Sequence, residues 1–182
     1  MKNTALSLRF FKRSTLTVAE ELLGCILCRR IGRKIFRLRI TEVEAYDGPQ
    51  DKASHAHRSK TARNIVMFGE GGKWYVYFTY GMHWMLNIVT GPESYPAAVL
   101  IRGVQGISGP ARLTKFLRVD KRFNNKRADP KTGLWIEKGQ KIPDNHIQRT
   151  PRIGVAYAGS WANKPYRLLL KEPVNQPVNL AG

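Results

Sequence analysis

The sequence predicts a mixed α/β (α+β) fold, a single compact domain over residues 1–182 built around an antiparallel β-sheet. Residues 36–40 alternate between apolar and polar, and residues 74–80 form an aromatic-rich alternating run, as half-buried strands do. Glycine-containing turns separate neighbouring strand patterns by a few positions, which favours antiparallel hairpins. No repeat or second-domain boundary interrupts the chain, and its length suits one domain with a sizeable core.

The N-terminal part predicts a short helix followed by a hairpin. Thr17 and Glu20 fit a capping box that opens a helix running to Leu23, and Gly24 is a natural stop. A strand over 25–29, a turn over 31–34 and a second strand from Ile35 complete the hairpin.

The middle of the chain predicts a second group of strands. The glycine cluster 69–72 lacks the Lys-Ser/Thr and the following helix of a phosphate-binding loop, so we expect a hairpin turn there. A strand over 74–80 follows, and residues 80–83 connect it to a strand over 85–90. A further strand is expected over 97–103.

The C-terminal part predicts one more helix and two late strands. Ser108 and Pro110 resemble an N-cap and a first-turn proline before a helix over 111–117. The basic run 115–131 is expected to be a loop that faces solvent or nucleic acid. Residues 152–157 and 166–170 are expected to be strands.

The charge balance points to a polyanionic partner. The chain has 31 Lys and Arg against 13 Asp and Glu, a net charge of +18, and a pI near 10.4. Such a field attracts nucleic acid, although it would equally suit a ribosomal or membrane-surface protein. No apolar run approaches the ~20 residues of a membrane span, so we expect no membrane association and an intracellular protein.

Two cysteines, Cys25 and Cys28, form the motif C-x-x-C. A structural zinc site needs four ligands, and the sequence has no second C-x-x-C or close histidine pair. Both cysteines lie in the apolar run 22–28, so we expect two buried thiols, no disulfide, and neither metal nor cofactor.

The most informative segment is 36–46. Phe36, Leu38 and Ile40 define the inward face of a strand, and simple alternation would continue this face through Glu42, Glu44 and Tyr46. Two carboxylates and a phenol aimed inward at a strand end would form an active site. The alternative is a bulge near Thr41 that turns both acids to water. The polar loop 47–64 then brings His, Arg and Asn side chains back towards the strand.

At this point the chain resembles a known family, the alkyladenine (3-methyladenine) DNA glycosylases. The resemblance is carried by ordered blocks at residues 41–46, 48–49, 53–55, 61–64, 67–68, 75–83, 86–87 and 99–102. It extends from 10–11 and 22–24 to 109–113, 152–154 and 158–165, which is almost the whole chain. The first 19 residues have no acid, as in a transit peptide, but the match over 10–23 assigns them to the domain.

The resemblance implies a monomeric, monofunctional glycosylase that acts on double-stranded DNA containing damaged purines, needs no cofactor or protein partner, and lies in the cytoplasm with the nucleoid in a bacterium. A DNA-intercalating β-hairpin would protrude from its compact fold. The implied roles are a general base for Glu44, orientation of the water for Arg102, base binding for Tyr46, His55 and Tyr77, exclusion of guanine for Asn87, intercalation for Tyr80, and DNA contact for Thr61, Arg63, Met67 and Met82.

Several points stay open on the sequence. Glu42 is a rival acid on the same nominal face as Glu44, and Tyr77 alternates away from Tyr80, so the strand would have to twist for both to reach one pocket. Ala62 stands where the family usually has proline, and Asp47 where an apolar residue is common. The motif offers no lysine for a Schiff base. The rival function is a catalytically silent, basic nucleic-acid-binding protein of the same fold.

Overall fold

The computed structural model describes residues 5–171 and confirms the α+β class. The described helices are α1 (Leu8–Phe11), α2 (Thr15–Leu22) and α3 (Pro110–Phe116), with short 3-10 segments η1 (Ile65–Phe68), η2 (Lys121–Phe123), η3 (Pro130–Thr132), η4 (Asp144–His146) and η5 (Ala156–Asn163). The strands are β1 (Ile26–Ile31), β2 (Lys34–Asp47), β3 (Trp74–Thr79), β4 (His83–Val89), β5 (Ala97–Val104), β6 (Ile107–Ser108), β7 (Leu134–Glu137), β8 (Ile147–Thr150) and β9 (Arg167–Leu170).

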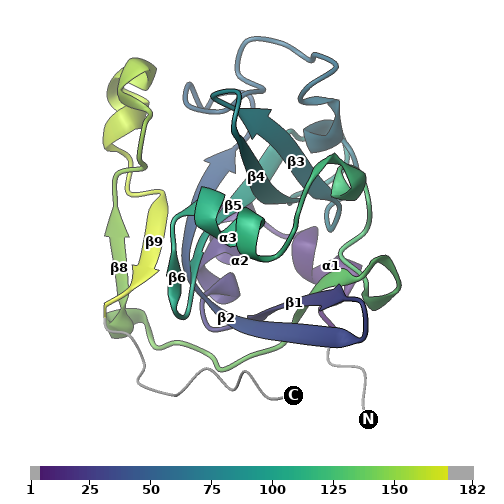
Figure 1. The fold of residues 1–182 in the computed structure, drawn as a ribbon. Coiled ribbons are helices and arrows are strands. Elements are labelled where there is room, and N and C mark those ends of the chain that lie inside the picture. Colours follow the sequence, from purple (N-terminus) through teal and green to yellow (C-terminus); the bar gives the residue numbers. More distant parts are fainter. Residues whose placement is uncertain (1–4, 172–182) are drawn as a thin grey trace.

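The strand pairs of the described residues are antiparallel, and the main path through the sheet is β3-β4-β5-β2-β1-β7. Figure 1 labels the first five strands of this path. The long strand β2 joins the two ends of this path, because its first half pairs with β1 and its second half with β5. Strand β9 also pairs with β2, and β8 pairs with β9 at one side of the molecule (Figure 1). Strand β2 is therefore the central support for whatever its second half carries.

A β-bulge divides strand β2 and corrects the expectation of one continuous inward face. The pairing with β5 shifts register between Ile40 and Val43. Before the shift Leu38 and Ile40 belong to the main core, and after it Val43 takes their place. The extra residue at the bulge moves the even-numbered side chains to the opposite face. Glu44 therefore leaves the core face, yet it stays fully buried and does not turn to water.

The sheet separates a large core from a smaller layer that carries the site. On the core face, α2 packs against β2 and β5, and α3 packs against β4 and β5. On the other face lie two small apolar clusters, one beneath residues 56–68 and one between the 53–56 loop and η5. The large core fixes the strands, and the second layer encloses the space between the sheet and these loops.

The helix boundaries differ slightly from the sequence prediction. Helix α2 begins at Thr15, and its N-cap is Ser14 instead of the predicted Thr17. The Ser14 hydroxyl accepts a hydrogen bond of 3.4 Å from the Thr17 amide. Gly24 ends this region as expected, with φ of +84°. Helix α3 begins with Pro110 after an N-cap at Gly109, so Ser108 is not its cap.

Other segments also differ from the expectation. Residues 152–157 form a turn that leads into η5 and are not a strand, whereas β8 lies just before them. The glycines 69–72 connect η1 to β3, so they do not form a hairpin turn. Strand β7 was not expected. The basic run 115–131 is partly folded, with Leu117, Val119 and Phe123 buried.

Cys25 and Cys28 are both buried, as predicted, and both are free thiols in the structure. Among residues 5–171, no helix has the length and apolar character to cross a membrane.

Candidate active site

A cavity of about 320 Å³ lies on the second face of the sheet. Alternate side chains of β3, β4 and β5 form its floor, while residues 53–67 and 153–157 supply its walls. The period of two along each strand sends Tyr75, Tyr77 and Asn87 into the cavity and their neighbours Trp74 and Val76 into the core. The cavity volume lies at the lower end of the usual range for ligand sites, about 300–1,000 Å³.

Three aromatic rings form one wall of this cavity. The His55 and Tyr77 rings meet edge to face with centroids 4.7 Å apart, and the Tyr75 and Tyr77 rings are 5.1 Å apart. The Nδ1 atom of His55 lies 3.1 Å from the Tyr75 hydroxyl. Edge-to-face contacts between rings, such as that of His55 with Tyr77, are favourable and help to fix ring orientation. The predicted base-binding residues Tyr77 and His55 are thus brought together, and Tyr46 also lines the cavity.

The surroundings of these rings keep them uncharged. Burial, with a further contribution from the nearby Arg63, lowers the pKa of His55 to about 4. Burial raises the pKa of Tyr77 to about 12. Burial, followed by the charge of Glu44, raises the pKa of Tyr46 well above its ordinary value. At neutral pH the cavity therefore presents a neutral imidazole and neutral phenols.

Glu44 is fully buried beside the cavity, and both of its carboxylate oxygens are occupied. The Ile153 amide donates to Oε1 at 2.8 Å, and the Tyr46 hydroxyl donates to Oε2 at 2.9 Å. The Arg102 Nη1 atom lies 3.4 Å from Oε2. Hydrogen bonds and an opposite charge offset the cost of burying a carboxylate. Glu44 is held in one position, next to the Arg102 side chain that lines the cavity.

Glu42 lies in a different environment. Its Oε1 atom accepts from Arg102 Nε at 3.1 Å and from Arg167 Nε at 2.6 Å. Arg102 therefore bridges the two acids, and Arg167 holds Glu42 from strand β9. Neither acid is itself among the residues that line the cavity. Glu44 is bonded to two residues that do line it, Tyr46 and Ile153, whereas Glu42 is bonded to Arg102 and to Arg167 of β9, so the structure separates two carboxylates that the sequence pattern treats alike.

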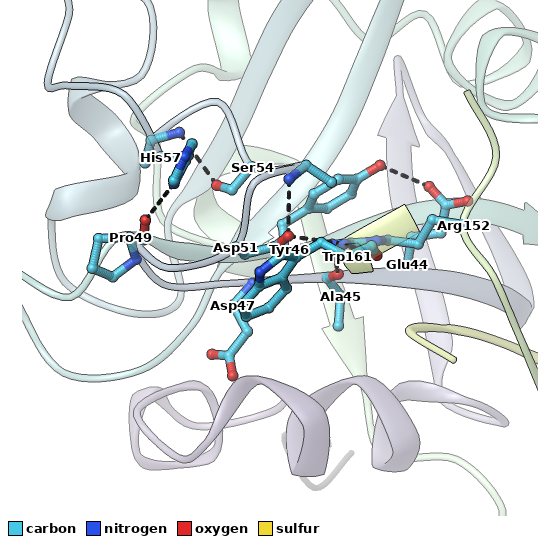
Figure 2. A network of polar contacts seen from close by, with 12 residues as sticks. Glu44, Ala45, Tyr46, Asp47, Pro49, Asp51, Ser54, His57, Arg152 and Trp161 are labelled. Carbon is cyan, nitrogen blue, oxygen red and sulfur yellow. Dashed lines mark hydrogen bonds and ion pairs between the residues drawn. The ribbon is translucent and has the colours of Figure 1, made fainter. Parts of the chain in front are cut away.

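A buried ion pair that the sequence reasoning missed supports this arrangement (Figure 2). Arg152 and Asp51 form two hydrogen bonds, and both side chains are completely buried. Arg152 Nη1 also donates to the Ala45 carbonyl at 2.8 Å. Arg152 belongs to a block that carried the family resemblance, and Asp51 lies in the polar loop, but 101 residues separate the two partners. No local pattern could have paired them.

The β3–β4 hairpin presents its tip to solvent at the edge of the cavity. Tyr80 is 81% exposed and Met82 is 66% exposed. Tyr80 has φ of +52°, so it has left the strand, and it lines the same cavity as Tyr77. No twist of β3 is needed to bring both tyrosines to one site, because the turn itself reverses the direction of Tyr80.

Asn87 and the expected DNA-contacting residues occupy three kinds of position. Asn87 is buried in the floor of the cavity, where its Nδ2 donates to the Tyr75 carbonyl at 3.1 Å. Thr61 and Arg63 are both exposed, and the Arg63 guanidinium lies 5.0 Å from the centroid of the Tyr77 ring, which lines the cavity. Met67 is only 2% exposed and lies in the lining of the cavity, not on the outer surface.

Within the described part of the chain, no group of three or more His, Cys, Asp and Glu side chains could hold a metal ion. The cavity is lined by aromatic rings and by Arg102, and the Glu44 carboxylate is buried beside it. An enzyme that removes a base from DNA must hold a flat ring and act on the bond beside it. The aromatic lining of this cavity suits the first task, and the buried carboxylate beside it suits the second. The class that fold, charge and site together define is the DNA glycosylases.

Comparison with known sequences narrows this class. The chain belongs to the methylpurine-DNA glycosylase family, whose family model matches residues 9–173. Several relatives bear the name "putative 3-methyladenine DNA glycosylase". One from Anaeromyxobacter dehalogenans is 40% identical over 89% of this chain and 80% of its own length. One from Streptomyces avermitilis is 40% identical over 96% of this chain and 92% of its own length. One from Myxococcus xanthus is 41% identical over 90% of this chain and 88% of its own length.

Proposed function

We propose that this protein flips alkylated or deaminated purines out of duplex DNA and hydrolyses their N-glycosidic bond with a water activated by Glu44. The substrate class comprises 3-methyladenine, 7-methylguanine, hypoxanthine and ethenoadenine. The observation that carries the proposal is the buried Glu44 carboxylate, held beside Arg102 at a cavity lined by Tyr46, His55 and Tyr77.

The aromatic wall supports binding of a flipped purine. Stacking of a base on an aromatic ring contributes ~1–3 kcal/mol and tolerates any flat base. An alkylated purine that carries positive charge gains further attraction from electron-rich ring faces. Neutral His55 and neutral tyrosines suit this task because they place no positive charge against the base. Asn87 on the floor crowds the exocyclic amino group of an undamaged guanine and so disfavours it.

The buried acid supports hydrolysis. Glu44 takes a proton from the water that attacks the sugar carbon, and its negative charge stabilises the developing oxocarbenium ion. Arg102 orients this water and keeps the carboxylate in place. A lyase would need an amine to form a Schiff base, and no lysine is among the described residues that line the cavity. The reaction therefore ends with a free base and an intact strand.

The exposed residues around the cavity support the engagement of DNA by a monomer. The Tyr80 ring at the hairpin tip enters the duplex and occupies the gap left by the flipped nucleotide. Met82 lies beside it in the groove, while Thr61 and Arg63 contact the strand next to the cavity. No other protein is required for these contacts.

The test is a single-turnover assay on duplexes that each contain one lesion, with an undamaged duplex as the control. We expect release of the free base, and strand cleavage only after alkali treatment. Cleavage without alkali would contradict the monofunctional reaction. Tight binding of lesion duplexes without base release would instead establish the catalytically silent binding protein of the same fold.

A further inference from the structure

We propose that Arg152, paired with Asp51, is a positioning residue that sets the geometry of the Glu44 carboxylate without touching it. This inference rests on the proposed function. It follows from the place of Arg152 between the two groups that hydrogen-bond to Glu44, the Tyr46 hydroxyl and the Ile153 amide.

The Arg152 guanidinium is fixed from both sides. It lies 4.8 Å from the centroid of the Tyr46 ring and 5.2 Å from that of the Tyr166 ring. A guanidinium within about 6 Å of an aromatic ring is attracted to its face. Because Tyr46 donates its hydroxyl to Glu44 Oε2, the cation that holds this ring also fixes the direction of that hydrogen bond.

The edge of the guanidinium is fixed by hydrogen bonds. Nη1 donates to the Ala45 carbonyl at 2.8 Å, and Nη2 donates to Asp51 Oδ1 at 2.8 Å and to the Trp161 carbonyl at 3.4 Å. Ala45 lies between Glu44 and Tyr46 in β2, so the hydrogen bond to its carbonyl anchors the strand next to Glu44. A planar guanidinium with a bidentate carboxylate is rigid, which an ammonium group cannot match.

The second partner of Glu44 is attached to Arg152 directly. Ile153 follows Arg152 in the chain, and its amide donates to Glu44 Oε1 at 2.8 Å. Fixing the Arg152 side chain against β2 therefore holds this amide at the carboxylate. Asp51 connects the pair to the loop, because its carboxylate oxygens accept hydrogen bonds from the amides of Asp47 and Ala53 at 3.1 and 3.0 Å. One ion pair thus joins strand, loop and the turn before η5 (Figure 2).

The chemistry of the pair favours geometry over stability as its role. Removing two charges from water is costly, and buried ion pairs contribute little net stability compared with apolar residues. Arg152 Nε has no hydrogen-bond partner among the described residues, which adds to this cost. The Asp51 charge balances that of Arg152, so the arginine can hold Tyr46 and Ala45 without adding net positive charge beside Glu44.

The experiment compares Arg152→Met, Arg152→Lys and Asp51→Asn with the wild type on one lesion duplex, measuring single-turnover base release and DNA affinity separately. We expect Arg152→Met to lose about 100-fold in rate, since small displacements of reacting groups cost this much, with affinity changed less than about threefold. Arg152→Lys keeps the cation between the rings and recovers part of the rate. Asp51→Asn loses rate with little change in affinity.

Arg13→Met is the matched control. Arg13 also stacks on a ring, at 4.4 Å from the Phe10 centroid, and also pairs with a carboxylate through two hydrogen bonds, but it does not line the cavity. Its rate should equal that of the wild type. Lesion affinity also reports folding, so a variant that binds normally is a folded one.

Two results would overturn the inference. In the first, Arg152→Met and Asp51→Asn release base as fast as Arg13→Met. In the second, the rate and the affinity fall together in all three site variants, including Arg152→Lys. Such a joint loss would mean that the pair is needed for folding and not for the position of Glu44. Failure of the wild type to release any base would instead reject the proposed function itself.

Discussion

At the scale of single residues, burial and partners distinguish side chains that look equivalent in the sequence. Glu42 and Glu44 are two positions apart on one strand, yet Glu42 accepts hydrogen bonds from two arginines, Arg102 and Arg167. Glu44 is held by a hydroxyl, an amide and a single arginine beside the cavity. This difference supports the proposal that Glu44 is the general base, whereas Glu42 forms an ion pair with Arg102.

Substitution of the two acids tests this distinction. Glu44→Gln removes the group that accepts the proton, so base release should fall by about 100-fold or more, while DNA affinity stays close to that of the wild type. Glu42→Gln should reduce the rate less, because it only loosens Arg102. Single-turnover rates of the two variants provide the measurement, and the reverse ranking would assign the base to Glu42.

The protonation of His55 is a second test at this scale. Its pKa is lowered to about 4 by burial and by Arg63, although the residue as a whole is exposed at the edge of the cavity. We therefore expect His55 in the folded protein to titrate below the ordinary pKa of ~6.5. As pH falls, His55 is protonated in the unfolded chain before it is protonated in the folded protein. The stability contributed by neutral His55 is therefore lost as pH falls from the unfolded pKa towards the folded one.

Titration of the His55 ring by NMR measures this pKa directly. Arg63→Gln removes the nearby charge and should raise the value. A pKa of His55 above ~6.5 would mean that the cavity presents a cation, which would oppose the binding of a positively charged base.

At the scale of elements, the bulge in β2 and the tip of the β3–β4 hairpin determine what the sheet presents to a ligand. The bulge lets one strand contribute Ile40 to the core and Glu44 to the opposite layer. The hairpin turn gives Tyr80 a positive φ and leaves its ring 81% exposed at the mouth of the cavity. Both features are local departures from regular strand geometry.

The role of the hairpin tip can be tested with Tyr80→Ala. The exposed ring contributes little to the core, so thermal stability should hardly change. If the ring fills the gap in the duplex, the variant should hold less of the flipped complex, while non-specific binding stays nearly constant because phosphate contacts lie elsewhere. The fluorescence of ethenoadenine in the duplex reports flipping. Unchanged flipping would move the wedge to Met82 or His83.

The connection between α2 and β1 provides a test of stability. Gly24 has φ of +84°, and a Cβ atom there would lie 2.3 Å from the Gln140 carbonyl oxygen. Gly24→Ala should therefore destabilise the fold by more than the ~1 kcal/mol of backbone strain alone. Gly32→Ala is the control, because Gly32 also has positive φ but open space around it. Urea unfolding of both variants gives the comparison, and equal losses would refute the steric argument.

At the scale of the whole molecule, the net charge of +18 governs the search for a target. Each neutralised phosphate contributes a slope of about −0.9 to the dependence of log affinity on log salt concentration. Affinity for undamaged duplex should therefore fall steeply between low and physiological salt, as a fluorescence anisotropy titration would show. A flat response would refute electrostatic search.

Chelators should leave base release unchanged, because the described residues offer no metal-binding group.

The sequence by itself determined the α+β class, the first hairpin, the burial of both cysteines and the family, because alternation, turn residues and ordered motifs are local signals. It also predicted a site near residues 41–46. Only the tertiary structure decided which face Glu44 occupies, since a one-residue bulge reverses every side chain that follows it. Pairing of Arg152 with Asp51 likewise depends on folding, because contacts across 101 residues leave no local pattern.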